Sequence, residues 1–278
     1  MARGDRRRIG PSAVDPTPTP SDDALFEPPT LDVTVVIPYF NPGGRLHETV
    51  EETVATLRRS GVSFEVVPVS DGSTDGSEAT IAALSPDVVS GVVRRHQGKG
   101  SAVRAGFRRG QGRYIGFIDG DGDIPPALLG DFLTVVAERR PDMVIGSKRH
   151  PDSDVVYPAI RRLTSWGYQR LVRLLFRLQV RDTQAGIKLI RRDVLVDILP
   201  GTVEDGYAFD LELLVAARRA GYDDIVEAPM RVRERLSSTI SAVAVAAMWR
   251  DTLAIWWRQR GPNARRTDPT RRGDPTQP

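Results

Sequence analysis

Short apolar segments alternate with longer amphipathic segments through the first half of the chain. The apolar segments, which are rich in β-branched residues and typical of buried strands, occupy residues 33–37, 64–69, 88–93, 114–118 and 142–145. The segments with helical periodicity lie between them, at about 46–59, 75–84, 99–109 and 126–139. Strand–helix alternation at this spacing predicts an α/β fold with a mainly parallel sheet flanked by helices.

Both ends of the chain lack this periodicity. Residues 1–31 and 261–278 are rich in Pro, Thr, Asp and Arg, a composition that predicts disordered tails. We therefore expect one α/β domain at 32–236, followed by an amphipathic segment at 237–260 and then the basic tail. Because no secretory signal and no apolar run of about 18 residues is found, we expect a cytoplasmic protein without a spanning helix.

Composition and charge exclude several classes of function. The 278-residue chain has no Cys, which excludes disulfides, thiolate zinc sites and cysteine nucleophiles. Residues 258–278 hold six Arg and two Asp, whereas residues 32–257 hold 29 basic and 29 acidic side chains. A nucleic-acid groove needs its basic surplus on the folded face, so no nucleic-acid partner is expected. The basic tail fits either attraction to anionic lipid or simple solvation.

Ligands of parallel α/β sheets bind at the carboxyl ends of the strands, and the loops expected there carry unusual residues. The first loop contains Pro38, Tyr39 and Asn41, and the second contains Ser70 and Asp71 in a Ser-Asp-Gly-Ser-Thr-Asp run. The Ser, Thr and Gly of the second loop suit a helix cap. Asp71 fits this explanation less well, because a carboxylate at a strand tip is costly unless a donor or a cation meets it.

Three carboxylates follow the fourth predicted strand, at Asp119, Asp121 and Asp123. Their mutual repulsion is relieved either by solvation or by a hard divalent cation such as Mg²⁺ or Mn²⁺ that also binds substrate phosphates. An EF-hand is excluded, since Ile124 and Gly130 stand where that loop requires Gly and Glu. We therefore expect a metal and phosphate site here.

The Gly98-Lys99-Gly100 run fits neither of two common phosphate-binding motifs. A P-loop would have Ser or Thr after the Lys, and a dinucleotide fingerprint would have a third Gly at position 103. The run is better interpreted as a flexible loop that carries one cation to the start of a helix.

Taken together, these loops resemble those of family-2 glycosyltransferases of the GT-A fold. The matching residues are the Val-Ile-Pro-Tyr-Phe-Asn opening, Asp-Gly-Ser-Thr-Asp, Gly-Lys-Gly and Asp119-x-Asp121. The resemblance implies a nucleoside-diphosphate sugar as donor, with UDP a better match than GDP. It implies donor contacts from Pro38, Tyr39, Asn41, Asp71, Lys99 and Asp119, and a divalent metal held by Asp119, Asp121 and Asp123. Pro42 stands where Glu is usual and Ser70 where Asp is frequent, so the details of base recognition differ.

The second half of the chain points to the acceptor. The segment Asp182-Thr-Gln-Ala-Gly-Ile-Lys-Leu189 resembles that of dolichol-phosphate glucosyltransferases and bacterial polyprenyl-phosphate sugar synthases, which implies a lipid phosphate as acceptor. The candidate acceptor-phosphate residues are Lys148, Arg149, Gln184, Lys188, Arg231, Arg233 and Arg235. Alternatively, the three Arg from 231 to 235 form the solvent face of an edge strand.

Two amphipathic segments predict membrane-interface helices. No acid occurs between Val155 and Arg181. On a helical wheel, one arc of this segment is apolar and the opposite flank is basic. The apolar arc holds Ile160, Leu163, Gly167, Leu171, Leu174, Leu175 and Leu178, and the basic flank holds Arg162, Arg170, Arg173 and Arg177. A core helix with a solvated face is the alternative. The second segment runs from Ile240 to Trp257, and the two contain all four Trp, at 166, 249, 256 and 257.

These features predict an inverting glycosyltransferase that acts at the cytoplasmic face of a membrane. A lipid phosphate is largely ionised at neutral pH, since its second ionisation lies at about pH 6, so attack on the anomeric carbon needs no strong base. Asp210 and Glu212 stand where relatives with hydroxyl acceptors keep a base and are candidate catalysts, although Glu212 is equally well a helix residue facing solvent. The alternatives are a glycan or protein hydroxyl as acceptor, with Asp210 as base, and a catalytically silent sensor of nucleotide sugars.

Overall fold

The computed structural model describes residues 23–81, 84–85, 87–89, 91–92, 95–154, 159–232 and 242–260, except for the side chains of 92, 159–166, 242–247 and 260. Its strands form a seven-stranded sheet in the order β3-β2-β1-β4-β6-β5-β7. The strands are β1 (Leu31–Tyr39), β2 (Phe64–Ser70), β3 (Gly91–Val92), β4 (Gly112–Ile118), β5 (Met143–Ser147), β6 (Ile187–Arg191) and β7 (Ile225–Pro229). The strand β6 is antiparallel to β4 and β5, and the other pairings are parallel. The predicted α/β fold with a mainly parallel sheet is confirmed.

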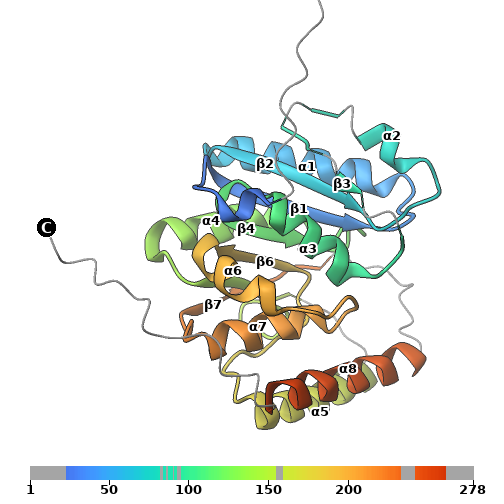
Figure 1. Cartoon of the computed structure of the whole chain (residues 1–278), viewed down its shortest axis with the longest axis vertical. Coiled ribbons are helices and arrows are strands. Elements are labelled where there is room, and N and C mark those ends of the chain that lie inside the picture. Colours follow the sequence, from blue (N-terminus) through green and yellow to red (C-terminus); the bar gives the residue numbers. More distant parts are fainter. Residues whose placement is uncertain are drawn as a thin grey trace, which may run out of the picture.

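Helices cover both faces of this sheet (Figure 1). The α-helices are α1 (Arg45–Ser60), α2 (Ser77–Ile81), α3 (Lys99–Arg109), α4 (Leu128–Arg139), α5 (Ala159–Phe176), α6 (Arg192–Ile198), α7 (Phe209–Arg219) and α8 (Ala242–Arg260). Helices α1 and α4 pack on one face, and α3, α6 and α7 pack on the other. Short 3₁₀ helices lie at Ala24–Phe26 and Leu199–Gly201.

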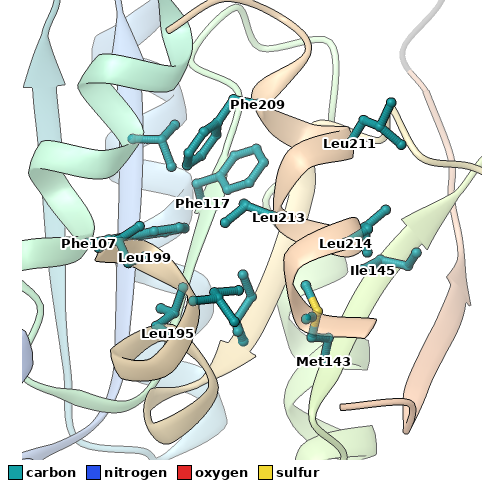
Figure 2. Close-up of a cluster of buried hydrophobic side chains, with 14 of the residues drawn as sticks. Phe107, Phe117, Met143, Ile145, Leu195, Leu199, Phe209, Leu211, Leu213 and Leu214 are labelled. Atoms are coloured by element: carbon teal, nitrogen blue, oxygen red, sulfur yellow. The ribbon is translucent and has the colours of Figure 1, made fainter. Parts of the chain in front are cut away.

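The core on the second face joins the two halves of the chain. Phe107 of α3, Phe117 of β4 and Phe209 of α7 pack together, with ring centroids 6.2 Å apart for Phe107–Phe117 and 6.4 Å apart for Phe107–Phe209 (Figure 2). All three rings are fully buried. Burial of side chains of this size contributes roughly 1.5–3 kcal/mol each. The cluster fixes the first turn of α7 beside the carboxyl end of β4.

The register places the ends of several strands at one edge of the sheet. Tyr39 at the end of β1 pairs with Ser70 at the end of β2, and Val36 pairs with Phe117 of β4. The loops that follow β1, β2 and β4 therefore meet at this edge, as expected for the carboxyl ends of parallel strands.

Some elements differ from the sequence prediction. The strand expected at 88–93 is reduced to Gly91–Val92, with an isolated bridge from Val88 to Val66. Residues 23–31, expected within a disordered tail, include the 3₁₀ helix, and Leu25 is fully buried in the core. The guanidinium of Arg192 fixes this segment, because it donates to the carbonyl oxygens of Ala24 and Glu27. The rest of both predicted tails, at 1–22 and 261–278, lies outside the described residues.

Helices α5 and α8 lie side by side at the end of the molecule, beyond α7 (Figure 1). Tyr168 of α5 contacts the ring of Trp249 edge-on, with centroids 5.6 Å apart, and its hydroxyl lies 2.9 Å from Oγ1 of Thr252. Within the described part of the chain, neither these helices nor any other is long and apolar enough to cross a membrane.

Candidate active site

Two of the loops at the carboxyl edge of the sheet are cross-linked by hydrogen bonds. The backbone N–H of Asp71 donates to the carbonyl oxygen of Tyr39 over 2.8 Å. The side chain of Asn41 accepts from the N–H of Thr74 over 2.8 Å, and its own N–H donates to Oγ of Ser73 over 3.0 Å. Asn41 has a φ of 44°, a left-handed conformation that Asn tolerates better than most residues. This predicted donor residue thus sets the shape of the loop that follows β1.

Pro38 and Tyr39, which are predicted to contact the donor, are buried at the end of β1. Burial raises the pKa of Tyr39 to about 12, although a hydrogen bond with Ser70 opposes the shift. The side chains exposed beside them are Phe40 and His96, whose rings stack with centroids 4.0 Å apart. Sequence analysis did not identify this pair, because the two residues lie far apart in the chain and belong to no periodic pattern.

Asp71 organises the loop that leads into α3. Its carboxylate is buried and accepts hydrogen bonds from the N–H groups of Gln97 over 2.9 Å and Gly98 over 2.8 Å. The Nδ1 atom of His96 lies 2.8 Å from the same carboxylate. These groups stabilise the buried carboxylate at the end of β2, which explains why an Asp is tolerated there. Asp71 thereby fixes the position from which Lys99 extends.

A row of alternating charges forms the floor of the site. The Nζ atom of Lys99 lies 2.7 Å from Oδ1 of Asp119 and 3.0 Å from Oδ2 of Asp210. The other oxygen of Asp210 contacts Nζ of Lys188. Three segments remote in sequence, at the starts of α3 and α7 and within β6, are thus joined to the tip of β4. The predicted residues Lys99, Asp119 and Asp210 do come together.

The pKa values of these groups reflect both burial and their neighbours. Burial disfavours the charged form of Lys99, but Asp119 and Asp210 outweigh burial and raise its pKa above the ordinary value. Burial raises the pKa of Asp119, and Lys99 offsets part of that shift. For Asp210, burial is outweighed by Lys188 and Lys99, so its pKa is lowered. Asp210 is therefore an ionised anchor for two ammonium groups, and a poor proton acceptor.

Asp119 contacts Gly186, a neighbour that could not be predicted from the sequence. Its N–H donates to the carbonyl oxygen of Gly186 over 2.9 Å, and its carboxylate packs directly on the Cα of that glycine. A Cβ atom at position 186 would lie 1.9 Å from Oδ2 of Asp119. The absence of a side chain at Gly186 is therefore required for this orientation of Asp119.

The acidic loop after β4 supplies oxygen ligands but no complete metal cage. Among the described residues, no group of three or more His, Asp or Glu side chains is arranged to hold a metal ion. The three carboxylates of Asp119, Asp121 and Asp123 are thus not clustered in this structure, and the expectation that they hold a divalent cation stays a prediction. Mg²⁺ typically takes one or two carboxylates together with substrate phosphates and water. The partly exposed Asp119, with Asp121 exposed nearby, fits a cation shared with a diphosphate.

Glu212 does not face solvent. It is buried in the first turn of α7, and its Oε2 accepts from the N–H groups of Val203 over 3.0 Å and Glu204 over 2.8 Å. The segment that Glu212 holds also contacts the start of α3, because the N–H of Gly100 donates to the carbonyl oxygen of Asp205 over 2.6 Å. The structure thus gives Glu212 a supporting role, in which it holds the segment that contains Val203 and Glu204.

Most predicted acceptor residues gather at the ends of β5 and β7. Lys148 and Arg149 follow β5, and Arg231 follows β7, the neighbouring strand. The side chain of Asp182 accepts from the N–H of Lys148 over 3.1 Å and from that of Gln184 over 3.0 Å. Asp182 thereby brings Gln184 to the same corner.

The structure does not place Lys188, Arg233 and Arg235 with the other predicted acceptor residues. Lys188 is fully buried and bound to Asp210, so the expectation that it contacts an acceptor phosphate is wrong. The apolar environment of a central strand encloses it. Arg233 and Arg235 lie outside the described residues, whereas Arg231 is exposed just beyond the edge strand β7.

Comparison with known proteins agrees with this geometry. The model of the family described as glycosyl transferase family 2 matches residues 34–199. The dolichyl-phosphate beta-glucosyltransferase of Drosophila melanogaster is 28% identical over 253 residues, which cover 84% of this chain and 77% of that protein. The undecaprenyl-phosphate mannosyltransferase of Micrococcus luteus is 32% identical over 243 residues, or 82% of this chain and 96% of that protein.

Solved structures share the fold. Glucosyl-3-phosphoglycerate synthase from Mycobacterium tuberculosis, crystallised with Mn²⁺, UDP and glucosyl-3-phosphoglycerate, matches with a TM-score of 0.63 and 20% identity, over 86% of this chain and 82% of that one. At this level of identity the match establishes a GT-A-like architecture. The family match covers more than half of the chain, so the protein belongs to glycosyl transferase family 2 and is a glycosyltransferase.

Proposed function

We propose that this enzyme transfers a sugar from a nucleoside-diphosphate sugar, with UDP as the nucleotide, to the phosphate of a polyprenyl or dolichyl phosphate at a membrane surface. The observation that carries the proposal is the neighbourhood of two sites. The Asp119–Lys99 pair lies at the tip of β4, and Lys148, Arg149 and Arg231 lie at the tips of β5 and β7. With β6 between β4 and β5, the tips of β4 and β5 are separated by roughly 10 Å, the span of two strand spacings, and β7 lies one spacing further.

The state of Asp210 favours a phosphate acceptor over a hydroxyl acceptor. A hydroxyl must lose its proton to a base as it attacks, whereas a phosphate monoester is already largely ionised near pH 7. Both oxygens of Asp210 contact ammonium groups and its pKa is lowered. The role of Asp210 is therefore to hold Lys99. A phosphate acceptor also agrees with the names of the relatives, which include dolichyl-phosphate and undecaprenyl-phosphate transferases.

In the reaction, a phosphate oxygen of the acceptor attacks the anomeric carbon, the bond from that carbon to the diphosphate breaks, and the nucleoside diphosphate leaves. Attack from the face opposite the leaving group inverts the anomeric configuration. Lys99 stabilises charge that develops on the leaving diphosphate, and the cations at β5 and β7 orient the acceptor. A divalent cation held by Asp119, with Asp121 or Asp123, would neutralise diphosphate charge when bound.

Helices α5 and α8 supply a surface suited to a membrane. Among the side chains of these helices that the structure describes, the exposed large apolar ones are Leu174, Leu253 and Trp257, with exposed fractions of 78%, 42% and 69%. The exposed basic side chains among those described on these helices are Arg170, Arg173, Arg250 and Arg258, and Arg177 is exposed directly after α5. The buried side of α5 includes Tyr168 and Val172. Of the predicted apolar arc, Leu174 is exposed and Leu171 and Leu175 are half-buried, whereas Leu178, directly after the helix, is buried in the core. This arrangement favours an interfacial helix over a core helix.

A donor panel tests the proposed reaction. Purified enzyme is mixed with vesicles that contain polyprenyl phosphate, with Mg²⁺ or Mn²⁺, and with UDP-glucose, UDP-galactose, UDP-N-acetylglucosamine or GDP-mannose labelled in the sugar. We expect label in the lipid fraction with a UDP-sugar, lost when EDTA is added, and an inverted anomeric configuration by NMR. Transfer to glycan or protein hydroxyls but not to the lipid would refute the acceptor. If none of the donors supported sugar transfer, the result would favour the hypothesis of a catalytically silent sensor of nucleotide sugars.

Membrane binding has its own prediction. The triple variant Leu174→Ser, Leu253→Ser, Trp257→Ser should pellet at least tenfold less with vesicles of phosphatidylglycerol and phosphatidylcholine. Each lost apolar contact costs about 1 kcal/mol or more, and about 1.4 kcal/mol corresponds to tenfold in affinity. The control is Phe26→Ser, which removes a similarly exposed ring, 49% accessible, from the amino-terminal 3₁₀ helix. Equal pelleting of the triple variant and the wild type would show that this face does not bind the membrane.

A further inference from the structure

Lys188 is a lysine in the middle of the sheet with no access to solvent. It belongs to β6, where it pairs with Phe117 of β4, and its side chain has an exposed fraction of 0%. Taking an ammonium group out of water costs several kcal/mol unless its partners are well placed. An apolar residue of similar size would often be equally stabilising at such a position. The presence of a charge there therefore calls for a role beyond packing.

The contacts of Lys188 all lead to the catalytic edge. Its Nζ binds one oxygen of Asp210, donates to the carbonyl oxygen of Ala185 over 2.7 Å and lies 5.2 Å from the centroid of the Phe117 ring. The Nζ of Lys99 lies 4.7 Å from the same centroid and 3.0 Å from the other oxygen of Asp210. Asp210 therefore bridges a buried ammonium group and one that reaches the donor site.

We propose that Lys188 is a positioning residue that fixes the carboxylate of Asp210, so that Asp210 holds the ammonium group of Lys99 against the leaving diphosphate. The inference rests on the proposed function and deepens it. Lys99 is shared between Asp119 and Asp210. When Asp119 engages the donor and its cation, Asp210 is the partner that remains to hold Lys99 in place. Asp210 in turn can keep one oxygen toward Lys99 because Lys188 occupies the other.

The surrounding charges support this arrangement. The groups that interact with Asp210 are Lys188 from β6, Lys99 from α3, Asp119 from the loop after β4 and Tyr168 from α5. Burial lowers the pKa of Lys188, and Asp210 opposes the shift. The four groups from Asp119 to Lys188 have alternating charges that sum to zero. Removing Lys188 would leave two carboxylates competing for the single ammonium group of Lys99.

The variant Lys188→Met, which keeps an unbranched side chain as far as Cε and removes the ammonium group, tests the inference. We expect kcat to fall by about 10²-fold, the size of effect seen when one preorganised charge-stabilising donor is lost. The KM for the donor should change less than threefold, because the proposed nucleoside contacts lie at the ends of β1 and β2 and in the loops that follow them. Combining Lys188→Met with Asp210→Asn should give a kcat no lower than that of Asp210→Asn alone, since both changes break the same chain.

The matched control is Arg192→Met. Arg192 is also a buried cation, but it binds the carbonyl oxygens of Gly110 and Gly112 at the opposite end of the strands. This variant should lower Tm while the folded protein retains its kcat. Should Lys188→Met fail to fold, Lys188→Gln, which keeps a donor for Ala185, takes its place. A wild-type enzyme without lipid-phosphate transfer would refute the proposed function. A transferring wild type with kcat unchanged in the Lys188 variant, or multiplicative effects in the double variant, would overturn this inference.

Discussion

Asp119→Asn is expected to lower the kcat of sugar transfer by about 10³-fold, the upper range for loss of one electrostatic contact in a preorganised site. The substitution keeps the shape of the side chain and its packing against Gly186, and it removes the charge. That charge is paired with Lys99 over 2.7 Å in the structure, and we propose it as a ligand of the cation. Kinetics with saturating donor and acceptor measure the effect.

Binding and stability measurements separate loss of chemistry from loss of fold. Calorimetry with Mn²⁺ and UDP should give heat for the wild type and little for Asp119→Asn, because the shared cation loses its carboxylate ligand. Glu138→Gln is the control, since Glu138 is an exposed acid in the last turn of α4, at the end of this helix that is remote from the loop after β4. If Asp119→Asn bound Mn²⁺ and UDP as the wild type does and kept its turnover, the assignment of this loop to the diphosphate would be wrong.

The first half of the fold could be predicted closely from hydrophobic periodicity. Helix α3 begins at Lys99 and ends at Arg109, as the pattern indicates, and β1, β2, β4 and β5 lie within a few residues of their expected positions. The strand β3 is shorter than predicted because it is the edge strand of the sheet, with β2 as its neighbour. At an edge, an apolar run has fewer backbone partners to extend the pairing.

In the second half, buried polar residues hide the pattern. The strand β6 contains the fully buried Lys188, and the first turn of α7 contains the buried Asp210 and Glu212. These side chains interrupt the apolar periodicity by which a strand or helix is identified. Sequence reasoning about local structure is expected to fail where function imposes buried charge. Two of the elements that the pattern missed, β6 and α7, thus supply Lys188 and Asp210 to the row of charges.

The candidate site could be predicted in its location and in part of its membership. The rule for carboxyl ends of parallel strands led to the loops of Asp71, Lys99 and Asp119, and the structure joins them at one edge. The partners of each residue could not be predicted, because Asp210 lies 111 residues from Lys99 in the chain. Their meeting depends on how α7 packs beside β4. For this reason Lys188 was assigned to the acceptor, although the fold buries it beneath Asp210.

Gly186→Ala should lower kcat/KM by about 10²-fold without unfolding the protein, because a displacement of about 1 Å at a reacting group can cost this much. The new Cβ would lie 1.9 Å from Oδ2 and 2.5 Å from Cγ of Asp119, so the carboxylate must rotate away from its place beside Lys99. The nearest atom belongs to the end of a side chain, so the backbone can stay in place and Tm should change little. Gly130→Ala on α4, where a Cβ meets no atom within 4 Å, is the matched control and should keep full activity. Wild-type turnover together with wild-type Mn²⁺ affinity in Gly186→Ala would show that the orientation of Asp119 is not required for transfer.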